Sequence, residues 1–243
     1  AYLVAVLRRL EAMYHEMHGA IAAPVLINDG VHPRFRYEAL TDSHACFLKG
    51  VKAISTLNAS MVLLKHGHAQ EIGALCRMVD DFCNEVFFLL VPQAGKKVSD
   101  DQMRFLENFF QEELDRPRDP LGSTQKRETV LARKIHATFA QLAKNELNPS
   151  DAQEMLRTTH QAFSGYIHGA YPHIMEMYGG NPPRFHLSGM PAEAPIVNGW
   201  RKQMVGYVYR LIMISIFVAR KLALPNMEAP LRTLMAEFEE KTG

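Results

Sequence analysis

Cysteine is scarce in this chain, and the few cysteines are not paired. The 243 residues include 3 cysteines, Cys46, Cys76 and Cys83, and none of them belongs to a Cys-x-x-Cys motif. An odd number of cysteines without that spacing indicates neither a disulfide framework nor a zinc knuckle. We therefore expect the protein to lie in a reducing, cytoplasmic environment.

A surplus of charge of either sign is also absent. Lys and Arg total 27, and Asp and Glu total 26, which gives a formal net charge of +1. No field of the whole protein therefore attracts nucleic acid or an acidic membrane. Binding to either would need a local patch.

The chain has no apolar run that reads as a clear membrane span. The N-terminal segment contains Arg8, Arg9 and Glu11 and is too polar for the core of a signal peptide. The main apolar segment, residues 203–219, is shorter than the roughly 18–20 residues that a span needs, and Arg210 lies at its middle. We expect a buried core helix there and no membrane partner.

Several catalytic and cofactor motifs are missing. The sequence contains no Gly-x-Ser-x-Gly elbow, no Gly-x-Gly-x-x-Gly and no Walker motif, which argues against a serine hydrolase and against nucleotide-driven chemistry. None of the 11 histidines has Glu three residues before it, the spacing that di-iron bundles use. The reverse spacing occurs at His68 with Glu71 and at His173 with Glu176, but zinc needs three or four ligands. We expect no cofactor and no bound metal.

The chain does have an apolar period of about 3.6 residues along nearly its whole length, which is typical of helices. The spacing predicts eight helices, over residues 2–21, 37–65, 68–90, 99–114, 123–145, 151–178, 196–224 and from 230 onward. Residues 116–122 and 181–195 are rich in proline and are expected to form flexible loops. The predicted fold class is an all-α, single-domain helical bundle over residues 1–243.

Local signals predict where some helices begin or bend. Ser99 followed by Gln102 is a capping box, and Ser123 is expected to cap the fifth helix. Pro172 has no amide hydrogen and clashes with the preceding turn of a helix. The sixth helix should therefore bend near His168.

Two stretches carry polar side chains on or beside an apolar helix face. In the third predicted helix, Arg77 lies three residues before Asp80 and four before Asp81, so these side chains form surface ion pairs or face a groove between helices. Residues 157–173 hold three histidines, one arginine and two tyrosines beside the expected bend, which suits a polar pocket. The alternative for that stretch is tight packing with hydrogen-bonded core histidines.

The order of these parts carries a resemblance to a known family. Residues 67–80 begin Gly-His-Ala-Gln-Glu and end Leu-Cys-Arg-Met-Val-Asp, and residues 164–169 read Ser-Gly-Tyr-Ile-His-Gly. Over residues 40–180 the chain resembles uncharacterised bacterial all-helical proteins related to the HEPN superfamily. The resemblance implies a HEPN-like helical core, a homodimer and a link to RNA in bacterial stress response or phage defence.

HEPN members that cleave RNA carry an arginine, then four to six residues, then a histidine, usually in a dimer cleft. These two side chains act on the ribose 2′-hydroxyl and the scissile phosphate without a metal, by acid–base catalysis and charge stabilisation. Here Arg157 is separated from His160 by two residues and from His168 by ten, whereas the fitting spacing occurs from Arg9 to His15. The likeness therefore departs from the catalytic pattern at the sixth helix.

The first hypothesis is a helical protein that binds or cleaves RNA, the cleaving form being a metal-independent endoribonuclease. The residues implied are Arg157, His160 and His168 as catalytic groups and Tyr166, Arg77 and Asp80 as substrate-binding groups. A second hypothesis is a non-catalytic helical module that holds a protein partner. The third is a helical metalloprotein.

Overall fold

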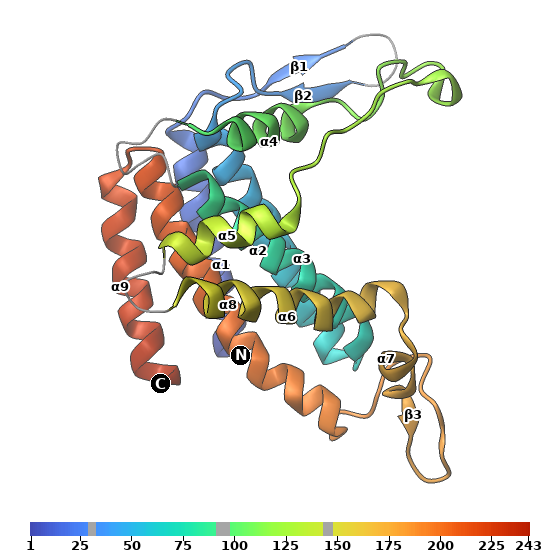
Figure 1. Cartoon of the computed structure of the whole chain (residues 1–243). Coiled ribbons are helices and arrows are strands. Elements are labelled where there is room, and N and C mark those ends of the chain that lie inside the picture. The colour runs from blue at the N-terminus through green and yellow to red at the C-terminus, as the bar shows by residue number, and fades with distance from the viewer. Residues whose placement is uncertain (29–32, 91–97, 143–147) are drawn as a thin grey trace.

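Five long helices with apolar faces build the centre of the protein. The computed structural model describes residues 1–28, 33–90, 98–142 and 148–243. The five helices are α1 (Tyr2–Gly19), α2 (Asp42–Lys65), α3 (Ala69–Leu90), α8 (Pro195–Lys221) and α9 (Pro225–Thr242) (Figure 1). α2 packs against α1, α3 and α8, and α8 also packs against α1, α3 and α9. The predicted all-α bundle is confirmed, with nine helices in the described part of the chain.

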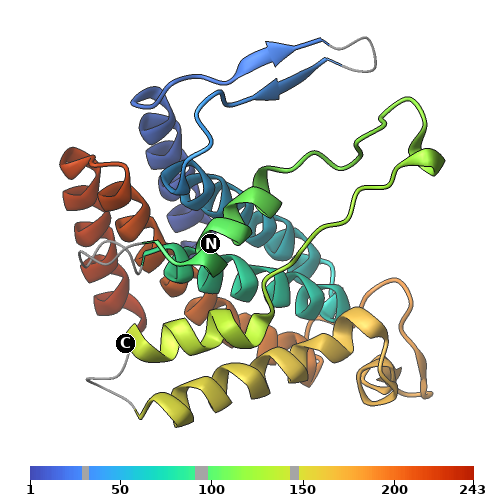
Figure 2. The same cartoon turned by 45° about the horizontal axis from the view of Figure 1, so that its top comes forward.

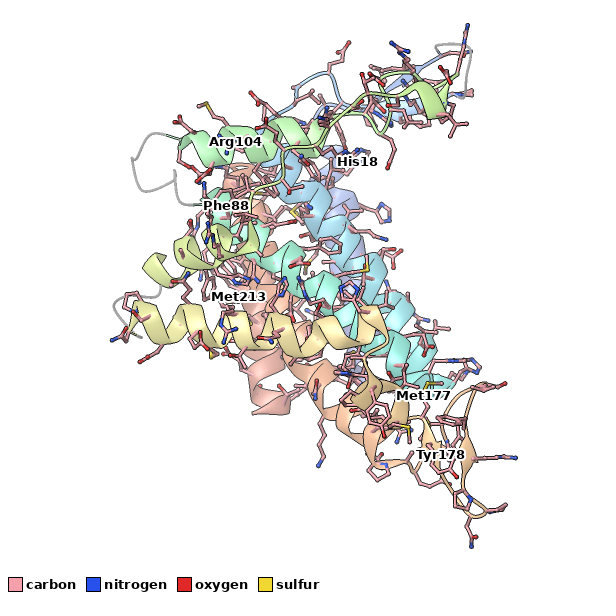
Figure 3. The ribbon with its side chains drawn as sticks, turned by 45° about the vertical axis from the view of Figure 1, so that its right-hand side comes forward. His18, Phe88, Arg104, Met177, Tyr178 and Met213 are labelled. Carbon is pink, nitrogen blue, oxygen red and sulfur yellow. The ribbon has the colours of Figure 1, made fainter. Side chains whose placement is uncertain are left out.

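Three further helices lie on the outer side of this bundle. α5 (Ala132–Leu142) and α6 (Pro149–His168) pack on α3 and on each other, and Figure 1 shows them side by side in front of the central helices. α4 (Asp100–Phe110) packs on α2. Phe88, near the end of α3, lies between α4 and α5 in Figure 3, and its ring meets that of Phe105 edge to face at 5.7 Å between centroids.

The core draws its side chains from helices that are far apart in the sequence. Leu7 of α1, Ile72 of α3, Leu211 of α8 and Phe238 of α9 are each 0% exposed. Full burial of one such side chain contributes roughly 1.5–3 kcal/mol to the free energy of unfolding. The three cysteines are buried and free.

The apolar character of α8 follows from its central place. By length and composition alone, α2 and α8 could each cross a membrane. Within the protein, 56% of the most apolar 18-residue stretch of α8 is buried. A helix that is apolar nearly all round is what the centre of a bundle requires.

Two helix starts illustrate how the caps act. Ser99 and Gln102 form the predicted capping box: the Ser99 N–H donates to Gln102 Oε1 at 2.8 Å, and the Gln102 N–H donates to Ser99 Oγ at 3.2 Å. α2 begins at Asp42 and not at residue 37 as predicted, because the Thr41 side chain caps it by accepting from the His44 N–H.

The segment before α2 forms a hairpin that the sequence analysis did not predict. β1 (Val25–Ile27) pairs antiparallel with β2 (Arg34–Arg36), and Leu26 lies opposite Phe35. Strands of three residues are too short to show an alternating pattern, which needs about four to eight. Residues 29–32, where the sequence predicts part of a loop, lie outside the described residues.

The prediction for the start of the fifth helix was wrong. α5 begins at Ala132, and the Ser123 hydroxyl donates to the Asp115 carboxylate at 2.5 Å instead of capping a helix. The predicted loop 116–122 contains one short 3-10 turn, η2 (Pro120–Gly122). The predicted end of the fifth helix at residue 145 lies outside the described residues.

The sixth predicted helix is divided at the expected bend. α6 ends at His168, because Gly169 adopts a left-handed conformation with φ of 59° and caps it. α7 (Tyr171–Met175) follows, with Pro172 in its first turn, where a missing N–H is tolerated. The continuous helix to residue 178 was therefore a wrong prediction.

The later part of the chain differs from the prediction at two places. The predicted loop 181–195 contains β4 (Arg184–Phe185), which pairs with β3 (Tyr178–Gly179), and α8 begins at Pro195. α9 begins at Pro225 and includes Pro230, which the sequence analysis placed at the helix start. Met227 lies one turn before Leu231 and is also buried, so the apolar face of the helix continues on the N-terminal side of Pro230.

We expect Leu211→Ala to lower the free energy of unfolding by about 2–5 kcal/mol, because it leaves a cavity at a fully buried position of α8. Val62→Ala, at a side chain that is 60% exposed on α2, is the matched control and should change the same quantity by less than about 0.5 kcal/mol. Urea denaturation of both variants measures this. Equal losses would contradict the assignment of α8 to the core.

Candidate functional site

A cavity of about 250 Å³ lies where α3, α5, α6 and α8 meet. Its polar lining consists of Arg77, Asp80, Asn84, Thr159, His160 and Arg210, and its apolar lining includes Phe87, Phe139 and Met213. Figure 3 places Met213 where α5 and α6 cross over the central helices. We call this space the α3–α6–α8 cavity.

Helical spacing brings the polar groups together. Arg77, Asp80 and Asn84 are three and four residues apart on α3, so they share one face of that helix. His160 faces them from α6, and Arg210 reaches them from α8. Residues far apart in the sequence thus meet in one cavity because each lies on the inner face of its own helix.

Asp80 is the most heavily engaged of these groups. Its side chain is almost fully buried, and it accepts a hydrogen bond from the Tyr207 hydroxyl at 3.1 Å and an ion-paired hydrogen bond from the Arg210 guanidinium. Burial raises the pKa of Asp80, while the charge of Arg210 and the Tyr207 hydrogen bond act in the opposite direction. These bonds tie α3 to α8 at the wall of the cavity.

Arg77 is the buried cation of the site. It is 7% exposed, and its guanidinium forms an ion pair with Asp81 one turn further along α3. Its Nε is buried and has no hydrogen-bond partner within the described part of the chain. Such an orphaned donor costs about 1–3 kcal/mol, so an acceptor oxygen from a ligand would be stabilised there.

Two histidines meet at the edge of the cavity. The rings of His136 of α5 and His160 of α6 lie 5.6 Å apart between centroids. Burial lowers the pKa of both, the proximity of His160 lowers that of His136 further, and the charge of Arg77 lowers that of His160 further. At neutral pH both imidazoles are therefore uncharged and able to accept a proton.

Three of the residues predicted from the sequence meet at this site. Arg77, Asp80 and His160 line the α3–α6–α8 cavity, as a shared polar site requires. Arg210 and His136 were not among the predicted site residues, although a feature of the sequence marks each of them as unusual. Arg210 interrupts the apolar face of α8, and His136 follows Ile135 on the buried face of α5. A charged or titratable residue on such a face needs a partner.

Two other predicted residues lie outside this cavity. Arg157 is exposed on α6, where its guanidinium donates to the Glu154 carboxylate at 2.6 and 2.8 Å and to Gln161 at 2.9 Å. His168 is the exposed last residue of α6. Neither side chain is brought to Arg77 or Asp80.

Tyr166 belongs to a separate aromatic cluster. Its ring packs against His173 at 4.2 Å and Trp200 at 5.8 Å between centroids, and its hydroxyl donates to Glu176 at 3.1 Å. A Cβ atom at Gly73 would lie 2.4 Å from the Tyr166 ring, so α3 accommodates this ring only through a glycine. The cluster lines its own cavity of about 300 Å³.

Among the described residues, no group of three or more His, Cys, Asp or Glu side chains is placed to hold a metal ion. The chain matches no protein-family model, no curated protein and no solved structure in the comparisons made.

Asp80→Asn should lower the free energy of unfolding by about 3 kcal/mol, because it removes the charge that offsets a partly buried arginine at the α3–α8 contact. Glu154→Gln removes the partner of an exposed arginine on α6 and should cause little or no loss. Guanidinium denaturation at neutral pH compares the two. A larger loss for Glu154→Gln than for Asp80→Asn would refute the central place of Asp80.

Stability should fall as the pH decreases from about 7 to about 5.5. The pKa values of His136 and His160 lie below the ordinary value of 6.5 in the folded protein, so the unfolded chain binds protons first as the pH falls. Proton binding then shifts the equilibrium toward the unfolded state. His160→Gln should reduce this pH dependence, measured as the change in denaturation midpoint between the two pH values. An unchanged dependence would count against a partly buried, neutral His160.

Proposed function

We propose that the chain binds RNA and that its α3–α6–α8 cavity takes one nucleotide, in the manner of a metal-independent endoribonuclease. The single observation that carries this proposal is the meeting of an uncharged imidazole, His160, with two guanidinium groups, Arg77 and Arg210, in one enclosed space. A neutral imidazole is suited to accept a proton, and guanidinium groups are suited to hold a phosphate.

The size of the cavity limits the ligand. Pockets for drug-sized ligands hold about 300–1,000 Å³, and this one holds about 250 Å³. It suits one nucleotide unit and not a folded strand. Phe87 and Phe139, whose rings meet edge to face at 5.2 Å, provide an apolar wall for a base.

The charges favour a phosphodiester over a polyphosphate. Asp80 holds Arg210 and Asp81 holds Arg77, so the site has little net positive charge. Each guanidinium has five N–H donors, more than these ion pairs use. The phosphate is bound by the remaining donors, with the buried Arg77 Nε among them.

In the cleavage step, His160 would accept the proton of the ribose 2′-hydroxyl as its oxygen attacks the phosphorus. The bond from phosphorus to the 5′ oxygen then breaks, and that oxygen takes a proton from solvent. The products are a 2′,3′-cyclic phosphate and a 5′-hydroxyl. Arg77 and Arg210 would stabilise the charge that develops on the phosphoryl oxygens.

The resemblance to HEPN-related proteins supports the same function but changes which residues carry it. The arginine and histidine of this cavity come from two different helices, α3 and α6, and not from one short motif. The resemblance and the unpaired cysteines together support a bacterial cytoplasmic setting, in stress response or phage defence.

The experiment is cleavage of end-labelled single-stranded RNA in the presence of EDTA. His160→Gln should reduce the cleavage rate by about 100-fold or more if its imidazole is the proton acceptor. His168→Gln and Arg157→Gln change the same residue types on exposed positions of α6 and should retain the wild-type rate. Circular dichroism confirms that each variant is folded.

Two results would overturn the proposal. One is loss of cleavage in His168→Gln or Arg157→Gln with full activity in His160→Gln. The other is the absence of both RNA cleavage and RNA binding in the wild-type chain.

A second candidate function, a non-catalytic module that binds a protein, rests on a different observation. Large apolar side chains are exposed away from the cavity, with Tyr171 77% exposed on α7 and Leu187 78% exposed after β4. Such side chains on projecting segments indicate an interaction surface. If the wild-type chain neither binds nor cleaves RNA, this function is the one favoured.

A further inference from the structure

The chain exposes more surface than a compact monomer of its size. Its solvent-accessible area is 14,062 Å², whereas a folded monomer of 27.5 kDa is expected to expose roughly 11,000 Å². The excess of about 3,000 Å² is several times the roughly 800 Å² that each partner buries in a standard interface. The surplus reflects an extended outline, which leaves surface available for a partner.

Two projecting segments account for the extended shape at one end of the molecule. Figure 2 shows the β1–β2 hairpin and residues 111–131, which we call the arm, extending away from the helices. At their bases the two are joined by the Arg36 guanidinium, which donates to the Glu112 carboxylate at 2.5 and 2.8 Å. A two-stranded hairpin alone is marginally stable in water, so these segments need a further contact surface.

The tip of the arm is ordered by its own hydrogen bonds. Asp115 accepts from the Ser123 hydroxyl at 2.5 Å and from the Thr124 hydroxyl at 3.0 Å, which closes the loop. The Asp119 side chain accepts from the Gly122 N–H at 3.1 Å and caps the η2 turn. This organised tip presents Leu121, which is 100% exposed. A preorganised apolar side chain in water is favourable mainly when a partner covers it.

A receptor for such a side chain lies at the base of the same arm. A cavity of about 540 Å³ is formed between the hairpin, α2, α4 and the base of the arm, which contributes Glu112, Glu113 and Arg127 to its polar side. Its apolar lining includes Phe35, Leu48, Phe109 and Phe110. Leu121 and this cavity are on the same chain but at opposite ends of the arm. Residues 112–121 span at most roughly 35 Å when extended, enough to reach a neighbouring molecule.

The charges favour a second copy over a polyanion as the partner. The arm contains five acidic residues, Glu112, Glu113, Asp115, Asp119 and Glu128, and four basic residues, Arg116, Arg118, Lys126 and Arg127. A nucleic-acid or membrane-binding arm requires a clear excess of positive charge. A nearly balanced set is compatible with an identical surface, in which each arm contacts the other chain by the same symmetry.

We propose that two copies of this chain exchange arms, with Leu121 of each packing against the apolar wall of the cavity between the hairpin and α4 of the other. The contact is isologous, so one symmetry axis relates its two halves. It lies at the end of the molecule that carries α4 and is separate from the α3–α6–α8 cavity, so it holds whether or not that cavity acts on RNA.

The first test is the mass of the full chain in solution by light scattering after size-exclusion chromatography. The wild type should have twice the monomer mass of 27.5 kDa at micromolar concentration. Leu121→Asp places a charge against the apolar wall formed by Phe35, Phe109 and Phe110 and should raise the dissociation constant at least about 30-fold. Because Leu121 is fully exposed within one chain, the variant should fold normally, and its thermal melting checks this.

Leu187→Asp is the matched control. Leu187 is also strongly exposed, at 78%, and it follows the short β3–β4 hairpin, which lies at the opposite end of the molecule from α4; Figure 3 shows this through Tyr178 and Arg104. This variant should dimerise as the wild type does. The proposal would be overturned if the wild type were still a monomer at a concentration about 50 times higher than that of the first measurement. It would also be overturned if Leu121→Asp dimerised as strongly as the wild type.

The second test locates the contact of Leu121. A photoreactive benzoylphenylalanine at position 121 should crosslink to peptides that contain Phe35, Leu48 or Phe109. A mixture of ¹⁴N- and ¹⁵N-labelled chains distinguishes crosslinks between two chains from crosslinks within one. Crosslinks confined to a single chain, or directed to other helices, would overturn the exchange of arms.

Discussion

The buried carboxylate of Asp80 is the interaction on which the arrangement of the polar cavity depends. It accepts from Tyr207 and Arg210, so it joins α3 to α8 through two different side chains. Without it, the partly exposed Arg210 side chain would lie in the middle of an apolar helix with no anion to offset its charge. The same pairing holds Arg210 at the cavity wall, next to Asn84 and opposite His160. Stability and site geometry therefore depend on one carboxylate.

The orientation of α6 separates residues that lie close together in the sequence. His160 and Thr159 face the cavity, whereas Arg157 lies on the outer surface with Glu154. His168 is two turns further along, at the exposed end that Gly169 caps. A sequence window rich in His, Arg and Tyr is thus divided into a cavity-lining group, a surface ion pair and the aromatic cluster around Tyr166. The arm and its apolar tip lie apart from all of these groups, at the end of the molecule that carries α4.

The helical period was sufficient to predict the all-α class and the five long helices, because each buries one face over many turns. It was insufficient for residues 25–27 and 34–36, where the strands are too short for a pattern, and for residues 123–131, where a side-chain hydrogen bond to Asp115 replaces a helix cap. Arg77, Asp80 and His160 could be selected from their types and positions. That these residues lie close to Arg210 and His136 could not be predicted. It depends on how α5 and α8 are rotated against α3, and no local spacing in the sequence specifies that rotation.

The most direct test of the central claim is an NMR titration of the histidine side chains with a nucleoside 3′-monophosphate. If the nucleotide enters the α3–α6–α8 cavity, the imidazole signals of His160 and His136 should shift together in a saturable manner, and a phosphate bound beside them should raise both pKa values. The His168 signal should remain unchanged, because this residue lies at the exposed end of α6. A saturable shift of His168 with constant His160 and His136 signals would contradict the account.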